Sequence, residues 1–461
     1  MSAIKIKKGL DIPIKGRPQG DVRPFKRSGE SSASIKRISL NLSEFNDLKF
    51  SLILKLNDKV RIGDPIAEDR TCPGRMFVSP AAGTIVEIRR GLKRSLLDIV
   101  IELDENETFK KFSPIDPKFS SRDEIIKRLL EGGGFSRIKR RPFDVLADPR
   151  HLPRTIFVKA IESLPFNPPP EMQVSGNESL FQIGLDALKK MSLSEVHLVY
   201  KKDSPLFKHF KNVQLHTAEG PHPIANPSLH IQEIDPILSN QDIIWTIDAL
   251  DVLVLGSLLV KGQYYIERVI GIGGPACLSD QCGFFKVREG FPIEALIAGR
   301  ASHGESPIRI ISGDVLTGHK AESDDFLGFF DYACVLIREN TDRQMLHFLR
   351  LGSDKFTASR SYLSGFFNNP SQPFDFTTSQ HGEKRPFIDG AIYDKVMPLH
   401  VPTVNLVKAV MAEDYELAEN LGLLEVVPED FALPSFIDPS KIEMTEIIKN
   451  GLKAYSKEVL Q

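Results

Sequence analysis

A run of cations interleaved with aromatic rings is the most distinctive chemical pattern in this sequence of 461 residues. Residues 135–143 contain four cations, two phenylalanines and an isoleucine, and they directly follow three glycines at 132–134. Glycines in this position end a helix, so the sequence predicts an exposed loop here. A loop with this mixture of side chains suits a contact with a partner protein or with phospholipid.

Other patterns that could carry chemistry are incomplete. Residues 271–275 read Gly-Ile-Gly-Gly-Pro, but the third glycine of a dinucleotide-binding loop is missing, so we expect a tight turn. His222 lies between two prolines, with no carboxylate or cysteine at metal-ligand spacing beside it. Cys277 and Cys282 lack the C-x2-C spacing of zinc or iron–sulfur sites. We therefore predict no catalytic residue and no metal ligand.

Short strands divided by turns fill residues 38–104. The turns at Gly63-Asp64 and at 80–83 resemble the corners of the barrel-sandwich hammerhead found in biotinyl and lipoyl carriers. Such a carrier needs a lysine at its hairpin tip to hold the swinging cofactor. The corresponding residues 69–77 contain no lysine. The sequence therefore predicts a structural module that carries neither biotin nor lipoate.

The next stretch has the alternation typical of an α/β domain. Ser121 and Glu124 have the spacing of a capping box at the start of a helix. Apolar runs at 155–160 and 195–200 read as buried strands, and residues 180–191 between them read as a helix. Strands and helices in this order predict a parallel sheet covered on both faces.

The remainder predicts a small mixed β domain followed by helices. Strands are expected at 266–272 and 308–312. Thr403 is expected to cap one C-terminal helix, and Ser440 with Glu443 to form a capping box for another.

Charge is unevenly distributed along a chain whose net charge is only −2. Residues 1–40 carry a balance of +7 and residues 411–461 a balance of −7, which we interpret as solvated faces and not as a nucleic-acid site. The basic arm, residues 1–37, is expected to be extended, mobile in isolation and ordered against a partner. Four scattered cysteines suit a reducing cytoplasm, and no apolar stretch approaches the ~20 residues that span a bilayer.

Motifs along nearly the whole chain resemble those of the alpha subunit of the bacterial sodium-translocating NADH:quinone oxidoreductases. The matching stretches, quoted as they stand here, are Ile6-Lys-Lys-Gly-Leu-Asp-Ile-Pro-Ile14, Ser79-Pro-Ala-Ala-Gly83, Arg140-Arg-Pro-Phe143, Gly220-Pro-His-Pro223, Ile311-Ser-Gly313 through Gly318, Lys355-Phe-Thr357, Val396-Met-Pro-Leu399 and Leu421-Gly422. That family is in turn similar to the nucleotide-binding subunits of respiratory complex I and of the Rnf complex. Those relatives hold an iron–sulfur cluster on four cysteines, whereas residues 433–441 contain none.

The resemblance implies an α/β multidomain fold. Its expected parts are a basic N-terminal arm (1–37), a biotinyl/lipoyl-like barrel-sandwich module (38–104), a Rossmann-like α/β domain (105–255), a β-grasp-like domain (256–340) and a C-terminal linker and helical bundle (341–461).

The resemblance also implies a function. The chain is expected to be a cofactor-free peripheral subunit on the cytoplasmic face of the bacterial inner membrane, held by integral-membrane partners, with FAD, FMN and the iron–sulfur centre on other subunits. The complex would oxidise NADH, reduce ubiquinone and pump Na⁺. The residues proposed to lie near quinone, because rings can wall its headgroup and cations can donate to its carbonyls, are Phe135, Arg137, Lys139, Arg140, Arg141, Pro142 and Phe143. The alternative is a self-sufficient soluble NADH or flavin dehydrogenase.

Overall fold

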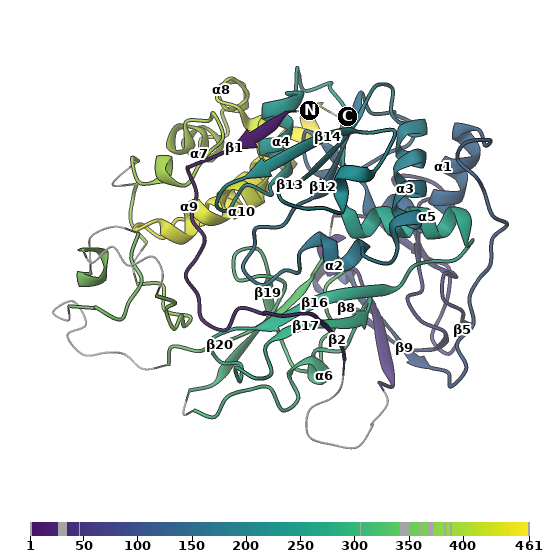
Figure 1. The fold of residues 1–461 in the computed structure, drawn as a ribbon, viewed down its shortest axis with the longest axis horizontal. Helices are drawn as coiled ribbons and strands as arrows, with labels where there is room; N and C mark the ends of the chain where they lie inside the picture. Colours follow the sequence, from purple (N-terminus) through teal and green to yellow (C-terminus); the bar gives the residue numbers. More distant parts are fainter. Residues whose placement is uncertain are drawn as a thin grey trace.

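The computed structural model describes residues 2–25, 35–45, 47–304, 306–341, 351–358, 362–366, 372–381, 384–387 and 390–459. Residues 26–34, which belong to the predicted arm, lie outside this part of the chain. Four sheets and the helices around them make up the fold, which is shown in Figure 1.

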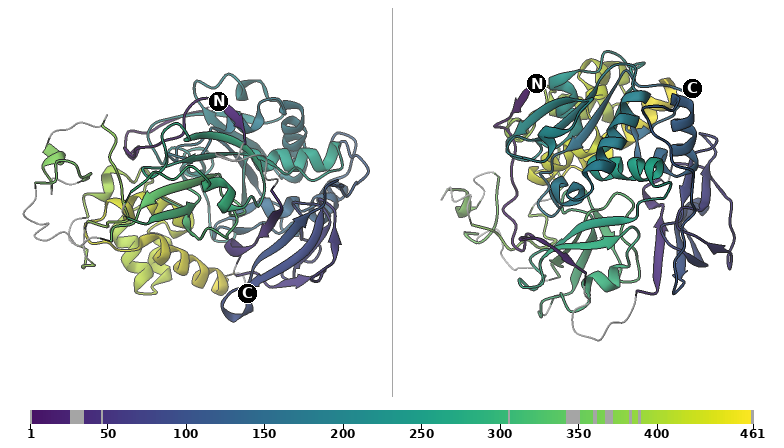
Figure 2. Two further views of the ribbon diagram at one scale, coloured as in Figure 1. Left: turned by 90° about the horizontal axis from the view of Figure 1, so that it is seen from below. Right: turned by 45° about the vertical axis from the view of Figure 1, so that its right-hand side comes forward.

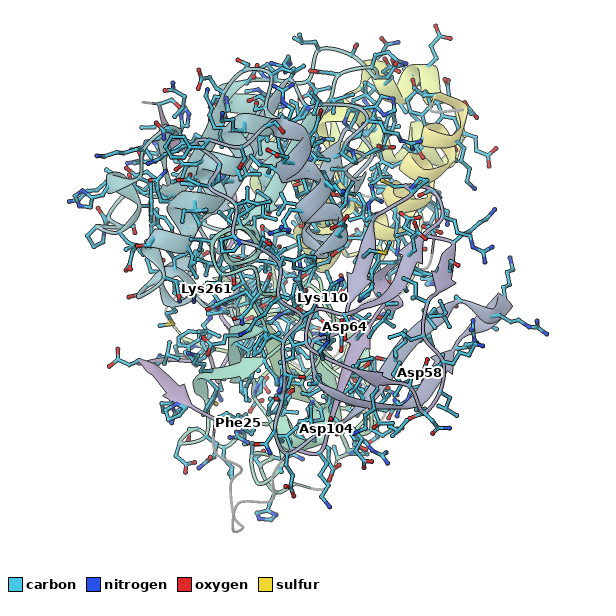
Figure 3. All side chains as sticks on the ribbon, turned by 90° about the vertical axis from the view of Figure 1, so that its right-hand side faces the viewer. Phe25, Asp58, Asp64, Asp104, Lys110 and Lys261 are labelled. Carbon is cyan, nitrogen blue, oxygen red and sulfur yellow. The ribbon has the colours of Figure 1, made fainter. Side chains whose placement is uncertain are left out.

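The barrel-sandwich module consists of two antiparallel sheets that face each other. Their strands are β3 (Arg37–Asn41), β9 (Leu96–Leu103), β8 (Gly83–Arg90) and β5 (Lys59–Val60) in one sheet, and β4 (Phe50–Leu52), β6 (Pro65–Asp69) and β7 (Met76–Val78) in the other. Ile38, Ile85 and Ile99 point between the sheets and share a hydrophobic core with Ile270 and Phe285 of the neighbouring six-stranded sheet. Figure 3 shows the solvent side of the module, which bears Asp58, Asp64 and Asp104.

A seven-stranded sheet forms the centre of the α/β domain. In spatial order its strands are β1 (Ala3–Lys5), β14 (Gln214–Glu219), β13 (Val196–Lys201), β12 (Thr155–Ala160), β15 (Ile244–Asp248), β10 (Lys139–Arg141) and β11 (Val145–Leu146). The strands from β1 to β15 are parallel, as expected, whereas β10 and β11 are antiparallel to their neighbours. The run β14-β13-β12-β15 has the 3-2-1-4 order of a doubly wound sheet.

Helices cover both faces of this sheet because its strands are apolar on both sides. Ile156 and Val158 of β12 point toward α3 (Glu178–Met191) and α5 (Ala249–Val260), while Phe157 points the other way, toward α4 (Pro227–Ile234). Two further helices of the domain are α1 (Arg122–Glu131) and α2 (Pro170–Val174). The Ser121–Glu124 capping box is confirmed at the start of α1.

A mixed six-stranded sheet with one short helix follows. Its strands, in spatial order, are β19 (His319–Ala321), β18 (Ile308–Ser312), β20 (Ala333–Arg338), β16 (Glu267–Gly273), β17 (Gly283–Arg288) and β2 (Val22–Pro24), and its helix is α6 (Ile293–Ile297). The glycines of residues 271–275 fall at the end of β16 and in the turn after it, where Gly274 has a φ of 112°. No helix begins there, as the sequence predicted.

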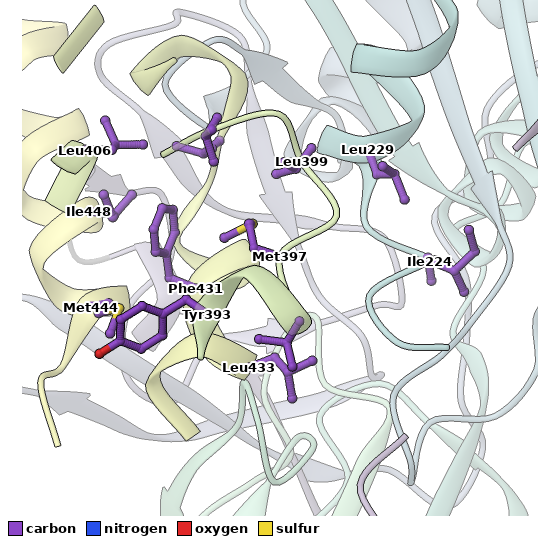
Figure 4. Packing of buried hydrophobic residues seen from close by; sticks show 14 of the residues in the cluster. Ile224, Leu229, Tyr393, Met397, Leu399, Leu406, Phe431, Leu433, Met444 and Ile448 are labelled. Carbon is purple, nitrogen blue, oxygen red and sulfur yellow. The ribbon is translucent and has the colours of Figure 1, made fainter. Parts of the chain in front are cut away.

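The C-terminal helices pack on the face of the parallel sheet that carries α4. They are α7 (Thr403–Met411), α8 (Tyr415–Asn420), α9 (Ala432–Ile437) and α10 (Met444–Val459). Figure 4 shows their core, in which Leu406, Phe431 and Ile448 lie together and Leu229 of α4 approaches from the parallel sheet. Both predicted caps were wrong. Thr403 is already inside α7, and the Ser440 hydroxyl donates to the carbonyl of Pro386, so it does not cap α10.

The N-terminal arm is bound to its own chain. It runs from β1 in the parallel sheet to β2 in the six-stranded sheet, and Figures 1 and 2 show this purple segment crossing between the two. Ile4, Ile12 and Ile14 are buried along the way. The expectation of an arm that is mobile in isolation and ordered by a partner was therefore wrong for residues 2–25, because single apolar residues between the charges supply enough surface to bury.

Candidate functional site

The predicted exposed loop at 135–143 is a buried element of the α/β sheet. Residues 134–137 form a 3-10 helix, and β10 follows in antiparallel pairing with β15. Phe135, Arg137 and Arg141 are each at most 2% exposed. The prediction failed because cations usually remain in water, whereas these have ionic or carbonyl partners inside the protein.

Arg137 lies at the centre of a buried ionic cluster, called the Arg137 cluster below. Its guanidinium donates to Asp251 Oδ1 at 3.0 Å and pairs with Glu289, which also receives Arg268 at 3.2 Å. The Tyr264 hydroxyl lies 2.5 Å from Arg137 Nη2. Burial by itself disfavours the charge of Arg137, but the carboxylates of Glu289 and Asp251 hold its pKa well above the usual range. The cluster joins the 3-10 helix to α5 and to the six-stranded sheet.

Arg141 and Phe143 face the opposite side and connect the α/β domain to the C-terminal helices. Arg141 donates to Ser228 Oγ at 2.9 Å and to the carbonyl of Glu425 at 2.8 Å. The Phe143 ring meets the Tyr455 ring edge-to-face, with centroids 6.0 Å apart. Both residues therefore fasten the C-terminal helices to the sheet.

The remaining candidates are placed separately. Phe135 packs edge-to-face on Trp245 at 5.7 Å, on the same side as the Arg137 cluster. Lys139 pairs with Asp144 at 3.3 Å and lies over the Phe330 ring. Arg140 and Pro142 are buried, and burial lowers the pKa of Arg140. The seven residues thus lie on two faces of the sheet and do not form one surface pocket.

The carboxyl edge of the parallel sheet, between β12 and β15, is where doubly wound sheets bind their ligands. Here Lys159 at the end of β12 pairs with Asp248 at 3.9 Å and with Glu162 at 3.7 Å. The pocket that these side chains line with Tyr332 measures about 30 Å³. That volume accommodates about one water molecule and no nucleotide.

The loop at 220–223 anchors the N-terminal arm. The backbone amide of His222 donates to Asp11 Oδ1 at 2.9 Å, and its carbonyl accepts from the amide of Leu10 at 2.8 Å. The imidazole Nδ1 lies 2.9 Å from Ser163 Oγ. Burial lowers the pKa of His222 to about 4, so its ring is neutral at physiological pH. The arrangement favours a structural role for this histidine.

The hairpin tip of the barrel-sandwich module is packed against the α/β domain. Asp69 and Arg75 form a buried ion pair at 2.7 Å across the tip. Arg75 also donates to the carbonyl of Ala147 at 2.5 Å, and Arg150 donates to the carbonyl of Thr71 at 3.1 Å. A tip held in this way cannot swing between active sites.

Sequence reasoning missed a cavity of about 350 Å³ beside the C-terminal helices. Its walls come from residues 12–14, 311–337, 356–381 and 435–443, so no single stretch of sequence identifies it. The clustering of half-buried phenylalanines near residues 356–376 was the one available signal.

Comparison with known proteins identifies the family. A family model described as the NqrA N-terminal barrel-sandwich hybrid domain matches residues 4–104, and one described as the NqrA second alpha/beta domain matches residues 120–264. The NqrA protein of the Na(+)-translocating NADH-quinone reductase of Chlamydia caviae is 38% identical over 470 aligned positions, which cover 99% of this chain and 97% of that protein. The chain belongs to the NqrA family.

Further NqrA relatives match over a similar length. The corresponding Na(+)-translocating NADH-quinone reductase proteins of Chlamydia pneumoniae and Saccharophagus degradans are 37% and 32% identical, each over 99% of this chain and over 98% and 100% of their own length. A chain of a solved NAD+-reducing [NiFe]-hydrogenase aligns with 50% of this chain and 52% of its own length at a TM-score of 0.33 and 10% identity, a likeness too weak to support an argument.

These comparisons confirm the resemblance predicted from the sequence motifs and, within the mixed α/β fold, the barrel-sandwich and α/β domains. Within the residues that the structure describes, no helix is long and apolar enough to cross a membrane. The same residues include no group of three or more His, Cys, Asp or Glu side chains that could hold a metal ion.

Proposed function

We propose that this chain is a peripheral subunit of a Na⁺-translocating NADH:quinone reductase, a complex that oxidises NADH, reduces ubiquinone and pumps Na⁺. The observation that carries this proposal is the 38% identity to the NqrA protein of Chlamydia caviae over 99% of the chain. The subunit sits on the cytoplasmic face of the inner membrane and is held there by the integral-membrane subunits.

The subunit binds no redox cofactor of its own, and FAD, FMN and the iron–sulfur centre belong to its partners. Three positive observations support this part of the proposal. The switch point of the parallel sheet is filled by the Lys159–Asp248 pair. The carrier tip lacks a lysine and is packed against residue 147. Residues 433–441 contain no cysteine and form part of a helical core.

The segment 135–143 serves quinone reduction by positioning and not as an exposed loop. Arg141 and Phe143 attach the C-terminal helices to the α/β domain, and the Arg137 cluster attaches the same segment to the six-stranded sheet. A quinone site shaped by this subunit depends on the relative placement of these parts. Arg141→Ala should therefore alter the apparent KM for quinone only together with thermal stability.

The proposal is tested by reconstituting the membrane complex with and without this chain. NADH oxidation is measured with ubiquinone and with ferricyanide, an artificial acceptor that takes electrons at the flavin subunit. We expect the chain to be required for the ubiquinone reaction and not for the ferricyanide reaction. Full quinone reduction by a complex that lacks the chain would refute the assignment.

Absorbance between 350 and 500 nm separates this proposal from a self-sufficient dehydrogenase. A flavoprotein must show bound flavin in that range, whereas a cofactor-free subunit should be colourless. Metal analysis of the same sample should find no stoichiometric iron. A stoichiometric flavin or iron centre on the purified chain would overturn the cofactor-free assignment.

A further inference from the structure

The cavity of about 350 Å³ lies where four parts of the chain meet. Ile12 and Ile14 of the N-terminal arm line it together with Ile311 of β18 and Ile337 of β20. Residues 356–381 and 435–443 form the other walls. Its volume falls within the range of about 300–1,000 Å³ that is typical of small-molecule sites.

Aromatic rings make up one wall of this cavity. Phe356 and Phe436 are nearly parallel, with centroids 5.7 Å apart, and Phe376 lies 5.6 Å from Phe356 and 5.9 Å from Phe436. All three rings are only half-buried. A group of half-buried rings around a hollow favours a flat apolar ligand, because such a ligand removes ring surface from water and can stack.

The polar groups of the cavity suit a neutral ligand that accepts hydrogen bonds. Lys441 and Glu443 both line it, so its walls carry one cation and one anion. The Lys441 ammonium donates one hydrogen bond to the carbonyl of Phe436 at 3.4 Å, and an ammonium has three donors. The Gln380 amide supplies further donors at the rim. An anionic nucleotide would find no surplus of positive charge here.

We propose that this cavity binds the ring of a quinone, with the phenylalanine wall against the ring face and Lys441 donating to a ring carbonyl. The choice of quinone among flat neutral acceptors rests on the proposed function, because the complex reduces quinone. The apolar residues of the arm and of β18 and β20 would then contact the isoprenoid tail.

The test uses the purified full-length chain and ubiquinone-1, a short-tailed soluble quinone, in equilibrium dialysis. Phe436→Ala removes part of the aromatic wall, and Ala358→Trp fills the cavity from another of its lining positions. Phe210→Ala is the matched control, because Phe210 is also half-buried and packs on two rings, Phe181 and Phe207, far from this cavity. Thermal melts report whether each variant is folded.

We expect one ubiquinone-1 per wild-type chain, a Kd raised at least ten-fold in Phe436→Ala and Ala358→Trp, and a change below two-fold in Phe210→Ala. Lys441→Met should raise the Kd several-fold while the fold is retained. If Phe436→Ala fails to fold, Ala358→Trp decides the outcome. Wild-type affinity in both cavity variants, or no binding to the wild-type chain, would overturn the proposal.

Two further measurements separate this inference from the proposed function. Palmitate, which has an apolar tail and no ring, should compete only weakly, and equal affinity for palmitate would refute a ring site. Ala358→Trp should still assemble into the membrane complex. Assembly with unchanged quinone affinity would reject the cavity and leave the proposed place of the chain in the complex intact, whereas failure of the wild-type chain to assemble would reject that place itself.

Discussion

Replacing Arg137 by methionine should destabilise the protein far more than a typical surface change. Methionine keeps the length of the side chain but removes the partner of Asp251, which is 2% exposed. Glu289 would keep Arg268, whose guanidinium lies 3.2 Å away, so Asp251 is the group left unpaired. Leaving one charge of a buried pair without its partner costs roughly 3–5 kcal/mol of unfolding free energy.

The loss should also depend on pH. Burial raises the pKa of Asp251 to about 6, and Arg137 opposes that rise. Without Arg137 the folded-state pKa should be higher still, so Asp251 takes up a proton that the unfolded chain, with a pKa near 3.8, has already lost. The stability of the variant should therefore fall as pH rises through the folded-state pKa, and the loss should be larger at pH 8 than at pH 5.

Denaturant unfolding followed by tryptophan fluorescence measures this effect. The single tryptophan, Trp245, packs against Phe135 and so reports on this part of the sheet. Arg137→Met with Asp251→Leu should recover most of the loss, because no buried charge is then unpaired. Arg150→Met is the control, since Arg150 forms an exposed pair with Asp148 and should change stability little. An Arg137→Met variant as stable as the wild type, or a double variant no better than the single one, would refute the reasoning.

Three other perturbations test the fold around the site. Gly256→Ala should cost several kcal/mol in unfolding free energy, because a Cβ on Gly256 would lie 1.9 Å from the carbonyl oxygen of Leu180 where α5 crosses α3, and an unchanged melting curve would contradict that close crossing. For His222, whose folded-state pKa is lowered from 6.5 to about 4, stability present at neutral pH should be lost as pH falls from 6.5 to 4, by about 3 kcal/mol. His222→Asn should remove that part of the acid loss in urea titrations at the two pH values, and an identical pH dependence in both proteins would argue against a neutral buried ring. Deleting residues 2–20 should lower the melting temperature of the isolated chain, since the arm supplies β1 and three buried isoleucines, and an unaffected melt would show that the arm does not stabilise the fold.

The sequence by itself determined those features that depend on neighbours along the chain. The strands and helix between residues 155 and 201 follow from apolar periodicity, and the start of α1 follows from the Ser121–Glu124 spacing. The carrier tip without a lysine could also be read directly, because the absence of a side chain type needs no structure. Motifs spread over the whole chain were sufficient to identify the family that the comparisons confirm.

Only the tertiary structure decided where the charged and aromatic residues of 135–143 lie. Local composition predicted exposure because an unpaired charge avoids the interior, but the partners that permit burial are distant in sequence. Arg141 meets Glu425, 284 residues away, and Arg137 meets Glu289, 152 residues away. The arm pairs with β14 and β17 in the same non-local manner. The cavity beside α9 likewise combines four separate stretches, because a pocket is formed by surfaces that fold together, and the order of residues along the chain does not encode which surfaces will meet.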